Sequence, residues 1–148
     1  MKIHHAPNSR SVRALWLFND LGLPYELEIY PLGDKSMRTP EYLRVHPLGR
    51  VPALEDGGLT IFESGAILMY LGEKAGKFFP QESPDRERVL EWLFWQIGGL
   101  GPMAGQVSHF VNYAPNFPGD HSYSEKRYKN EYDRLLGVMD KVLDEREF

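Results

Sequence analysis

The sequence predicts an α/β domain with a four-stranded mixed sheet, followed by an all-α domain. Segments with the period-two pattern of strands alternate with segments of helical periodicity through the first 76 residues. Residues 56–58 (Asp-Gly-Gly) separate two apolar runs, which is a hairpin signal. Every later periodic pattern is helical. We therefore expect an amino-terminal domain over residues 1–76, a linker over 77–83 and the start of a helical domain over 84–148.

The first half of the amino-terminal domain predicts a strand, a helix and a strand. Residues 2–5 form a short apolar-mixed run, and residues 25–30 alternate with period two, as strands do. Asn8 and Ser9 are both good helix N-cap residues. The helical periodicity that follows comprises Val12, Leu15, Trp16, Phe18 and Leu21. Residues 22–24 (Gly-Leu-Pro) are expected to end that helix.

The second half predicts a short helix, a hairpin and a longer helix. The short helix covers residues 39–45, and the hairpin strands cover 51–55 and 59–62. The last helix begins at Ser64 and closes at Gly76. A right-handed strand-helix-strand unit followed by a hairpin and a helix gives the thioredoxin arrangement.

The remaining sequence predicts two helices. Residues 83–85 (Ser-Pro-Asp) are typical of a helix start. A strongly aromatic periodicity then predicts one long helix with a kink, because glycines interrupt it between residues 98 and 105. Residues 112–119 are expected to form a loop. Ser122 with Glu125 predicts a capping box at the start of a second amphipathic helix.

The composition excludes several classes of function. The 148 residues carry a net charge of −4 and no basic run, so we expect no nucleic-acid partner. No apolar stretch approaches the roughly 20 residues that span a bilayer, so we expect no membrane partner. The amino terminus lacks the hydrophobic run of a signal peptide, which favours a cytoplasmic protein. The chain has no cysteine, so thiol chemistry needs a thiol from outside. The five histidines lack metal-ligand spacing, so we expect no metal.

A proline at the start of a predicted strand makes Val51 and Pro52 candidate binding residues. Proline cannot donate a hydrogen bond to a sheet. If the bond between the two residues is cis, the N–H and C=O of Val51 turn outward, and a short peptide can dock there as an added strand. The alternative is an ordinary trans-proline at a strand entry. The residues alone do not separate the two.

Glu63 and Ser64 stand directly after a predicted strand, at a helix start. The free N–H groups there and the Ser64 hydroxyl suit a ligand carboxylate, and Glu63 suits a ligand ammonium. The alternative is that Ser64 is only an N-cap and Glu63 a solvated charge, which these two residues alone favour.

Asn8 and Ser9 precede the first predicted helix. A thiol placed there would be acidified by hydrogen-bond donors and by the helix dipole. Simple helix capping is the alternative, and taken alone it is preferred. Arg10 and Arg13 are interpreted as solvated helix charges rather than as groups that tune a thiolate.

In the thioredoxin arrangement these three pairs open on one edge of the sheet. Together they predict a site for a zwitterionic amine and carboxylate at one end and for a thiol at the other.

Four segments together resemble the amino-terminal domain of cytosolic glutathione transferases. They are residues 8–13, 19–26, 46–54 and 62–71. Residues 92–106 are similar to the bacterial nu-class branch, whose members are associated with glutathione-dependent disulfide reduction. The resemblance implies an enzyme that takes glutathione as co-substrate and uses its thiol to attack an electrophile or a disulfide. The alternative is a non-catalytic module that keeps the fold for binding or regulation.

The resemblance also implies how glutathione is held. Val51 would pair through its backbone with the cysteinyl part, before a cis Pro52. Glu63 and Ser64 would hold the γ-glutamyl end, and Arg50 would lie near the glycyl end.

The resemblance places Asn8 near the sulfur, with Ser9 as the neighbouring hydroxyl, and Arg127 of the helical domain against bound glutathione. Nu-class members usually have Asn-Gly where this chain has Asn8 and Ser9, so the side chain that assists the thiol stays open. The family continues well past Phe148, so we expect an incomplete helical domain. Aromatic residues between 92 and 95 and the glycines after them predict a homodimer.

Overall fold

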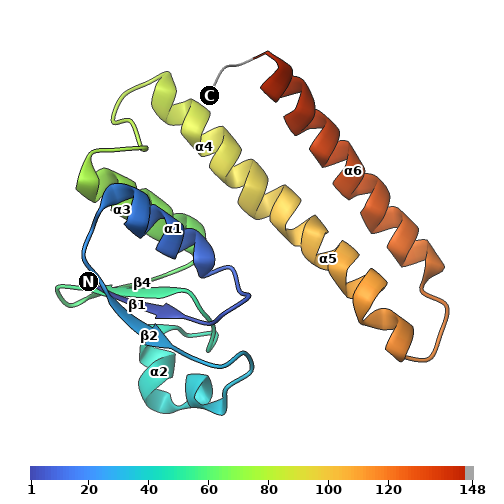
Figure 1. Cartoon of the computed structure of the whole chain (residues 1–148), viewed down its shortest axis with the longest axis horizontal. Coiled ribbons are helices and arrows are strands. Elements are labelled where there is room, and N and C mark those ends of the chain that lie inside the picture. The colour runs from blue at the N-terminus through green and yellow to red at the C-terminus, as the bar shows by residue number, and fades with distance from the viewer. Residues whose placement is uncertain (146–148) are drawn as a thin grey trace. The chain divides into compact units, whose positions relative to one another are not determined.

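The computed structural model describes residues 1–145 and divides into two compact units, Met1–Glu87 and Arg88–Phe148 (Figure 1). The linker expected over residues 77–83 stays a prediction.

The first unit is built on a four-stranded mixed sheet, as the sequence predicts. Its strands are β1 (Lys2–His5), β2 (Glu26–Ile29), β3 (Ala53–Asp56) and β4 (Leu59–Phe62), in the order β2-β1-β3-β4. β1 pairs with β2 in parallel, and β3 is antiparallel to both β1 and β4. The segment that contains Val51 and Pro52 therefore enters a central strand of the sheet.

Helices join these strands in the predicted order. They are α1 (Val12–Leu21), the 3₁₀ helix η1 (Lys35–Arg38), α2 (Pro40–Val45) and α3 (Ser64–Ala75). α1 and α3 each end at a glycine with left-handed backbone, Gly22 at φ 65° and Gly76 at φ 63°. Such a glycine lets its N–H satisfy a carbonyl of the last turn. The Thr39 hydroxyl caps α2 by accepting from the Tyr42 N–H, 3.4 Å away.

The apolar core of this unit lies between the sheet and the helices α1 and α3. Figure 1 shows these two helices on one face of the sheet and α2 on the other. The fully buried core residues are Ile3, Ala14, Phe18, Leu54, Ile67 and Leu71. Burying one large apolar side chain contributes about 1.5–3 kcal/mol, so this cluster holds the helix starts firmly over the sheet.

The second unit is helical, as expected. α4 (Asp85–Trp95) passes through a π-helical segment, η2 (Gln96–Leu100), into α5 (Gly101–Asn112). After the short 3₁₀ helix η3 (Ala114–Asn116), α6 (Ser122–Asp144) packs against α5. Wider, π-helical turns replace α-helical ones at η2, within the segment where the sequence predicts a kink; the kink itself stays a prediction. No helix within residues 1–145 is long and apolar enough to cross a membrane.

Two predicted helix caps are wrong. The N-cap of α6 is His121 and not Ser122, whose N–H donates to the Asp120 carboxylate over 2.9 Å. The capping box with Glu125 is therefore not formed. α1 begins at Val12 with Ser11 as its N-cap, so Asn8 and Ser9 lie in the preceding turn.

α3 begins at Ser64, as the sequence predicts, and its N-cap is Glu63. The alternative, that Ser64 is only an N-cap, is therefore wrong.

Candidate functional site

A cleft of about 640 Å³ in the first unit brings together four of the predicted site residues. Asn8 and Ser9 line it from the turn before α1, and Arg50 and Val51 line it from the loop before β3. The two segments meet because β1, which precedes the turn, pairs with β3. Glu63 and Ser64 are not among the described residues that line this cleft.

Basic side chains predominate among the charged residues that line this cleft. They are Arg10, Lys35, Arg38 and Arg50, against the acidic Asp34. A ligand carboxylate is therefore attracted to the cleft more than a ligand ammonium is.

The Val51-Pro52 peptide bond is cis. Pro52 is buried, whereas Val51 is only partly buried and lines the cleft. Within residues 1–145, the backbone N–H and C=O of Val51 have no hydrogen-bond partner. Free backbone groups beside a sheet are what an extended peptide needs in order to pair as an added strand.

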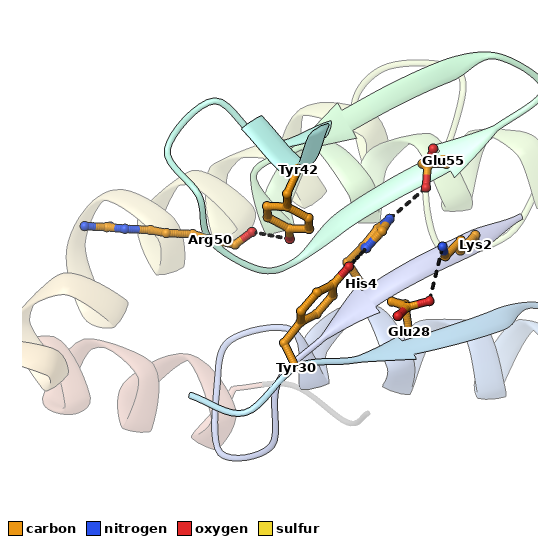
Figure 2. Close-up of polar contacts among 7 residues, drawn as sticks. All are labelled: Lys2, His4, Glu28, Tyr30, Tyr42, Arg50 and Glu55. Carbon is orange, nitrogen blue, oxygen red and sulfur yellow. Dashed lines mark hydrogen bonds and ion pairs between the residues drawn. The ribbon is translucent and has the colours of Figure 1, made fainter. Parts of the chain in front are cut away.

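Contacts at the backbone of Gly49 and Arg50 fix the loop that carries Val51. Gly49 has φ 58°, and a Cβ there would collide with the carbonyl oxygen of Met37, so only glycine fits. The Gly49 N–H donates to the His46 carbonyl over 2.8 Å. The Tyr42 hydroxyl donates to the Arg50 carbonyl over 2.6 Å (Figure 2). The backbone of this loop is thus held at two consecutive residues.

Glu63 follows β4 as the N-cap of α3, and Ser64 is the first residue of that helix. Glu63 has a left-handed backbone, with φ 72°, which is uncommon for a residue with a side chain. Such conformations occur often at ligand-binding sites. Ser64 is buried, and Glu63 is exposed.

Arg13 contacts a candidate site residue, which the sequence did not reveal. Its guanidinium reaches from α1 to the Ser64 hydroxyl and donates over 3.3 Å. Burial, followed by repulsion from Arg10, lowers the pKa of Arg13, which stays a cation at any ordinary pH. The expectation of a solvated charge is wrong, because half-buried Arg13 ties the start of α1 to the start of α3.

Asn8 and Ser9 differ sharply in their hydrogen bonding. The Ser9 hydroxyl donates to the Ala6 carbonyl over 2.7 Å and accepts from the Ser11 N–H over 3.2 Å. Ser9 therefore stabilises the turn that precedes α1. Asn8 is exposed, with φ 58°, and its amide has no partner within residues 1–145.

The Ser11 hydroxyl extends this turn network inward. It contacts the Ser9 hydroxyl, and it lies 2.8 Å from Nδ1 of His5. Burial lowers the pKa of His5, which favours the neutral ring. The turn that presents Asn8 is therefore fixed by uncharged hydrogen bonds.

His46 lies behind the loop and against β4. Its ring packs on Phe62, with centroids 5.2 Å apart, and its Nδ1 accepts from the Leu48 N–H over 3.3 Å. Burial lowers the pKa of His46, partly opposed by the charge of Glu63. The neutral ring with its proton on Nε2 fits these contacts, because Nδ1 must accept.

Arg127 lies on α6 in the second unit and is exposed. With Lys126, Arg134 and Tyr123 it lines a separate cavity of about 680 Å³. The structure thus places Arg127 in a basic surface hollow of its own unit.

Metal-ligating side chains do not gather anywhere in residues 1–145. No group of three or more histidine, aspartate or glutamate side chains lies close enough together there to hold a metal ion.

The amino-terminal unit matches a known domain family. Residues 1–73 match the model of the glutathione S-transferase N-terminal domain. The chain is also 41% identical over 150 residues to the disulfide-bond oxidoreductase YfcG of Escherichia coli, covering 96% of this chain and 68% of the relative. This chain belongs to the glutathione transferase family.

Two further relatives are similar over most of the chain. The disulfide-bond oxidoreductase YghU of Escherichia coli is 36% identical over 86% of this chain, which spans 44% of that relative. Protein URE2 of Candida albicans is 33% identical over 95% of the chain, which spans 42% of it. The chain thus spans less than half the length of these two relatives.

Solved structures of glutathione transferases share this fold. A family member from Pseudomonas fluorescens, crystallised with two glutathione molecules bound, matches with a TM-score of 0.91 at 40% identity. The match covers 99% of this chain and 67% of that one. A glutathione transferase from Pseudomonas putida with glutathione disulfide bound matches with a TM-score of 0.90 at 36% identity, over 99% and 66%.

Proposed function

We propose that this transferase binds glutathione in the cleft of its first unit and activates the thiol for attack on an electrophile or a disulfide. The observation that supports this proposal is that one cleft is lined by the free backbone groups of Val51, the unpaired amide of Asn8 and the basic residues. A tripeptide with a thiol and a free carboxylate is complementary to these three features.

The backbone of Val51 is proposed to pair with the cysteinyl residue of glutathione. This pairing would run the tripeptide along the loop before β3 as an added strand. Arg50, supported by Arg38 and Lys35, is then proposed to attract the glycyl carboxylate, since these cations line the same cleft.

Glu63 and Ser64 are proposed to hold the γ-glutamyl end. The α-carboxylate would accept from the Ser64 hydroxyl and from N–H groups of the first turn of α3, and Glu63 would pair with the ammonium. Arg13 supports this assignment, because its contact with Ser64 adds positive charge at the carboxylate position.

We assign stabilisation of the thiolate to Asn8 rather than to Ser9. A side chain that lowers the pKa of a thiol must donate a hydrogen bond to the sulfur. The single Ser9 proton is directed at the Ala6 carbonyl, whereas the exposed Asn8 amide is available at the cleft.

Disulfide reduction by this chain would need two glutathiones, because it has no cysteine. The first thiolate attacks one sulfur of the disulfide, forming a mixed disulfide and releasing one substrate thiolate. The second glutathione thiolate attacks the glutathione sulfur of that mixed disulfide. This releases glutathione disulfide and the second substrate thiol, so that two electrons pass from two glutathiones to the substrate.

We also propose nu-class membership, a homodimer, a cytoplasmic location and contact of Arg127 with glutathione. The bacterial disulfide-bond oxidoreductases among the relatives support nu-class membership. Sedimentation velocity at micromolar concentration tests the homodimer, since a chain that stays monomeric contradicts it.

The second candidate function is a regulatory module without catalysis, which the similarity to the nitrogen regulation fragment of the yeast prion protein Ure2p favours. Isothermal calorimetry with glutathione, followed by turnover with a glutathione-reactive aryl halide and with a small disulfide, separates the candidates. Binding with turnover supports the enzyme. Binding without turnover of either substrate favours the regulatory module, and absence of binding contradicts the glutathione site itself.

A further inference from the structure

We propose that Tyr42 is a positioning residue for glutathione, acting through the Arg50 carbonyl. The hydrogen bond from its hydroxyl would fix the backbone that presents Val51 to the ligand. This inference rests on the proposed function, because it concerns how the same cleft binds its ligand.

The contact itself is short and sheltered. The hydroxyl of Tyr42 donates to the carbonyl oxygen of Arg50 over 2.6 Å, and only 6% of Tyr42 is exposed. Figure 2 shows the Arg50 side chain extending away from the Tyr42 ring, so the tyrosine holds the backbone and leaves the guanidinium free to move. Burial raises the pKa of Tyr42, so its hydroxyl keeps its proton and remains a donor.

The Tyr42 ring is in turn held by aromatic neighbours from two strands. His4 on β1 meets it edge-on with centroids 5.4 Å apart, and Tyr30, just past β2, meets it at 5.1 Å. Such pairs prefer tilted geometries and resist rotation of either ring. The position of the Tyr42 hydroxyl is therefore set by the sheet and not by α2 alone.

His4 is the centre of this cluster. It is 3% exposed, and its Nε2 lies 2.8 Å from the carboxylate of Glu55 on β3. Because a carboxylate accepts, Nε2 carries the proton, and in the neutral ring Nδ1 accepts from the Tyr30 hydroxyl over 2.9 Å. Figure 2 shows this chain of contacts running from Glu55 through His4 to Tyr30, with Tyr42 beside it.

The cluster thus connects three strands with the loop before β3. Backbone carbonyls in loops turn easily unless a donor fixes them, and a partly buried carbonyl left without a donor is costly. Without the Tyr42 hydroxyl, the Arg50 carbonyl has to seek water, and the Val51 N–H, which shares its peptide plane, turns with it. Preorganisation of this kind contributes to affinity and leaves the chemical step unchanged.

The test compares Tyr42→Phe with Tyr70→Phe. The control removes a hydroxyl that donates over the same 2.6 Å, to Asp56 at the hairpin end of the same unit. Tyr70 lines neither the cleft nor the loop before β3. Both variants should lose similar thermal stability, so a purely structural role of Tyr42 would affect both alike.

Calorimetry and steady-state kinetics with glutathione provide the readout. Tyr42→Phe is expected to raise the dissociation constant and the KM for glutathione about five- to twentyfold relative to Tyr70→Phe, from the loss of one partly buried hydrogen bond. The kcat at saturating glutathione and the pKa of the bound thiol should be those of the wild-type chain. Equal affinities in the two variants would overturn the inference, as would a fall in kcat with unchanged KM.

Tyr30→Phe is the second variant, in case Tyr42→Phe does not fold. It releases Nδ1 of His4 and loosens the neighbour of Tyr42, so a rise in KM of about two- to threefold over Tyr70→Phe is expected. Identical values contradict the inference. If the wild-type chain binds no glutathione, the proposed function and this inference both fail. If the wild-type chain binds glutathione and the variants bind it equally, only this inference fails.

Discussion

The Arg13 guanidinium on α1 donates to the Ser64 hydroxyl at the start of α3, over 3.3 Å. This contact joins the two helix starts at which the sequence predicted the thiol and the γ-glutamyl group. Ser64 thus has one role toward the protein, and we propose a second role for it toward the ligand.

Replacing Ser64 by alanine tests the second role. Ser64→Ala removes a hydrogen-bond donor to the ligand carboxylate and separates Arg13 from its partner, so the affinity for glutathione is expected to fall about tenfold. Calorimetry measures this fall. Ser108→Ala on α5 is the matched control, because its hydroxyl contacts only Asn112 among the described residues. Equal affinities in both variants would contradict the assignment.

Asn8→Ala and Ser9→Ala are expected to separate chemistry from stability. Asn8→Ala should raise the pKa of bound glutathione toward that of the free thiol, since each unit lost corresponds to about 1.4 kcal/mol of thiolate stabilisation. Ser9→Ala should lower the melting temperature, because its hydroxyl holds the turn, and should change the thiol pKa less. The reverse order of effects in an ultraviolet titration would assign the thiol to Ser9.

The basic lining of the cleft predicts a salt-dependent affinity. Arg50→Gln is expected to weaken glutathione binding about two- to fivefold at low ionic strength, and less at high salt. Arg44→Gln on α2 removes a comparable exposed charge that does not line the cleft. If both variants bind equally at every salt concentration, the glycyl carboxylate lies elsewhere.

Phe18 is expected to dominate the stability of the first unit. Phe18→Ala should reduce the free energy of unfolding by about 3–5 kcal/mol, because the side chain is fully buried between α1 and the sheet. Trp16→Ala on the same helix removes a larger ring that is 70% exposed, and it should cost far less. Urea denaturation measures both, and similar losses would contradict the described core.

His46 predicts a loss of stability in mild acid. Burial lowers the pKa of His46 below 6.5, so the unfolded chain binds the proton more readily than the folded one. Its contribution is complete above pH 6.5 and is lost as the pH falls through the lower, folded pKa. The wild-type melting temperature should therefore fall between pH 7.5 and pH 5.5. His46→Gln should reduce that fall without removing it, because burial also lowers the pKa of His5. An unchanged pH dependence in His46→Gln would contradict this assignment.

Periodicity made the fold of this chain largely predictable. Period-two runs, the Asp-Gly-Gly turn and glycine helix ends correspond to β1 to β4, α1 and α3 nearly residue by residue. The N-cap predictions failed at two helices, because the Ser9 hydroxyl donates to the Ala6 carbonyl in the turn before α1, and the Ser122 N–H donates to the Asp120 carboxylate. Local sequence cannot show which of several adjacent polar residues will turn toward the helix.

The residues that line the cleft could be predicted from the sequence, whereas the contacts that hold these residues in place could not. Asn8, Arg50 and Val51 follow from strand pairing, which brings the ends of β1 and β3 together. The contacts of Arg13 and Tyr42 depend on side chains that reach from one element to another. Arg13 and its partner Ser64 are 51 residues apart in the sequence. One signal was present for the buried cluster: His4 is a polar residue in a central strand, beside Ile3, and such a residue needs buried partners.

We propose that the chain binds glutathione and lowers the pKa of its thiol. Titrating the ultraviolet thiolate band of glutathione bound to the chain is the decisive measurement. The band is expected to appear at a pH at least one unit below that of free glutathione, with Asn8→Ala moving it back. A bound thiol that titrates at the same pH as free glutathione would contradict the account.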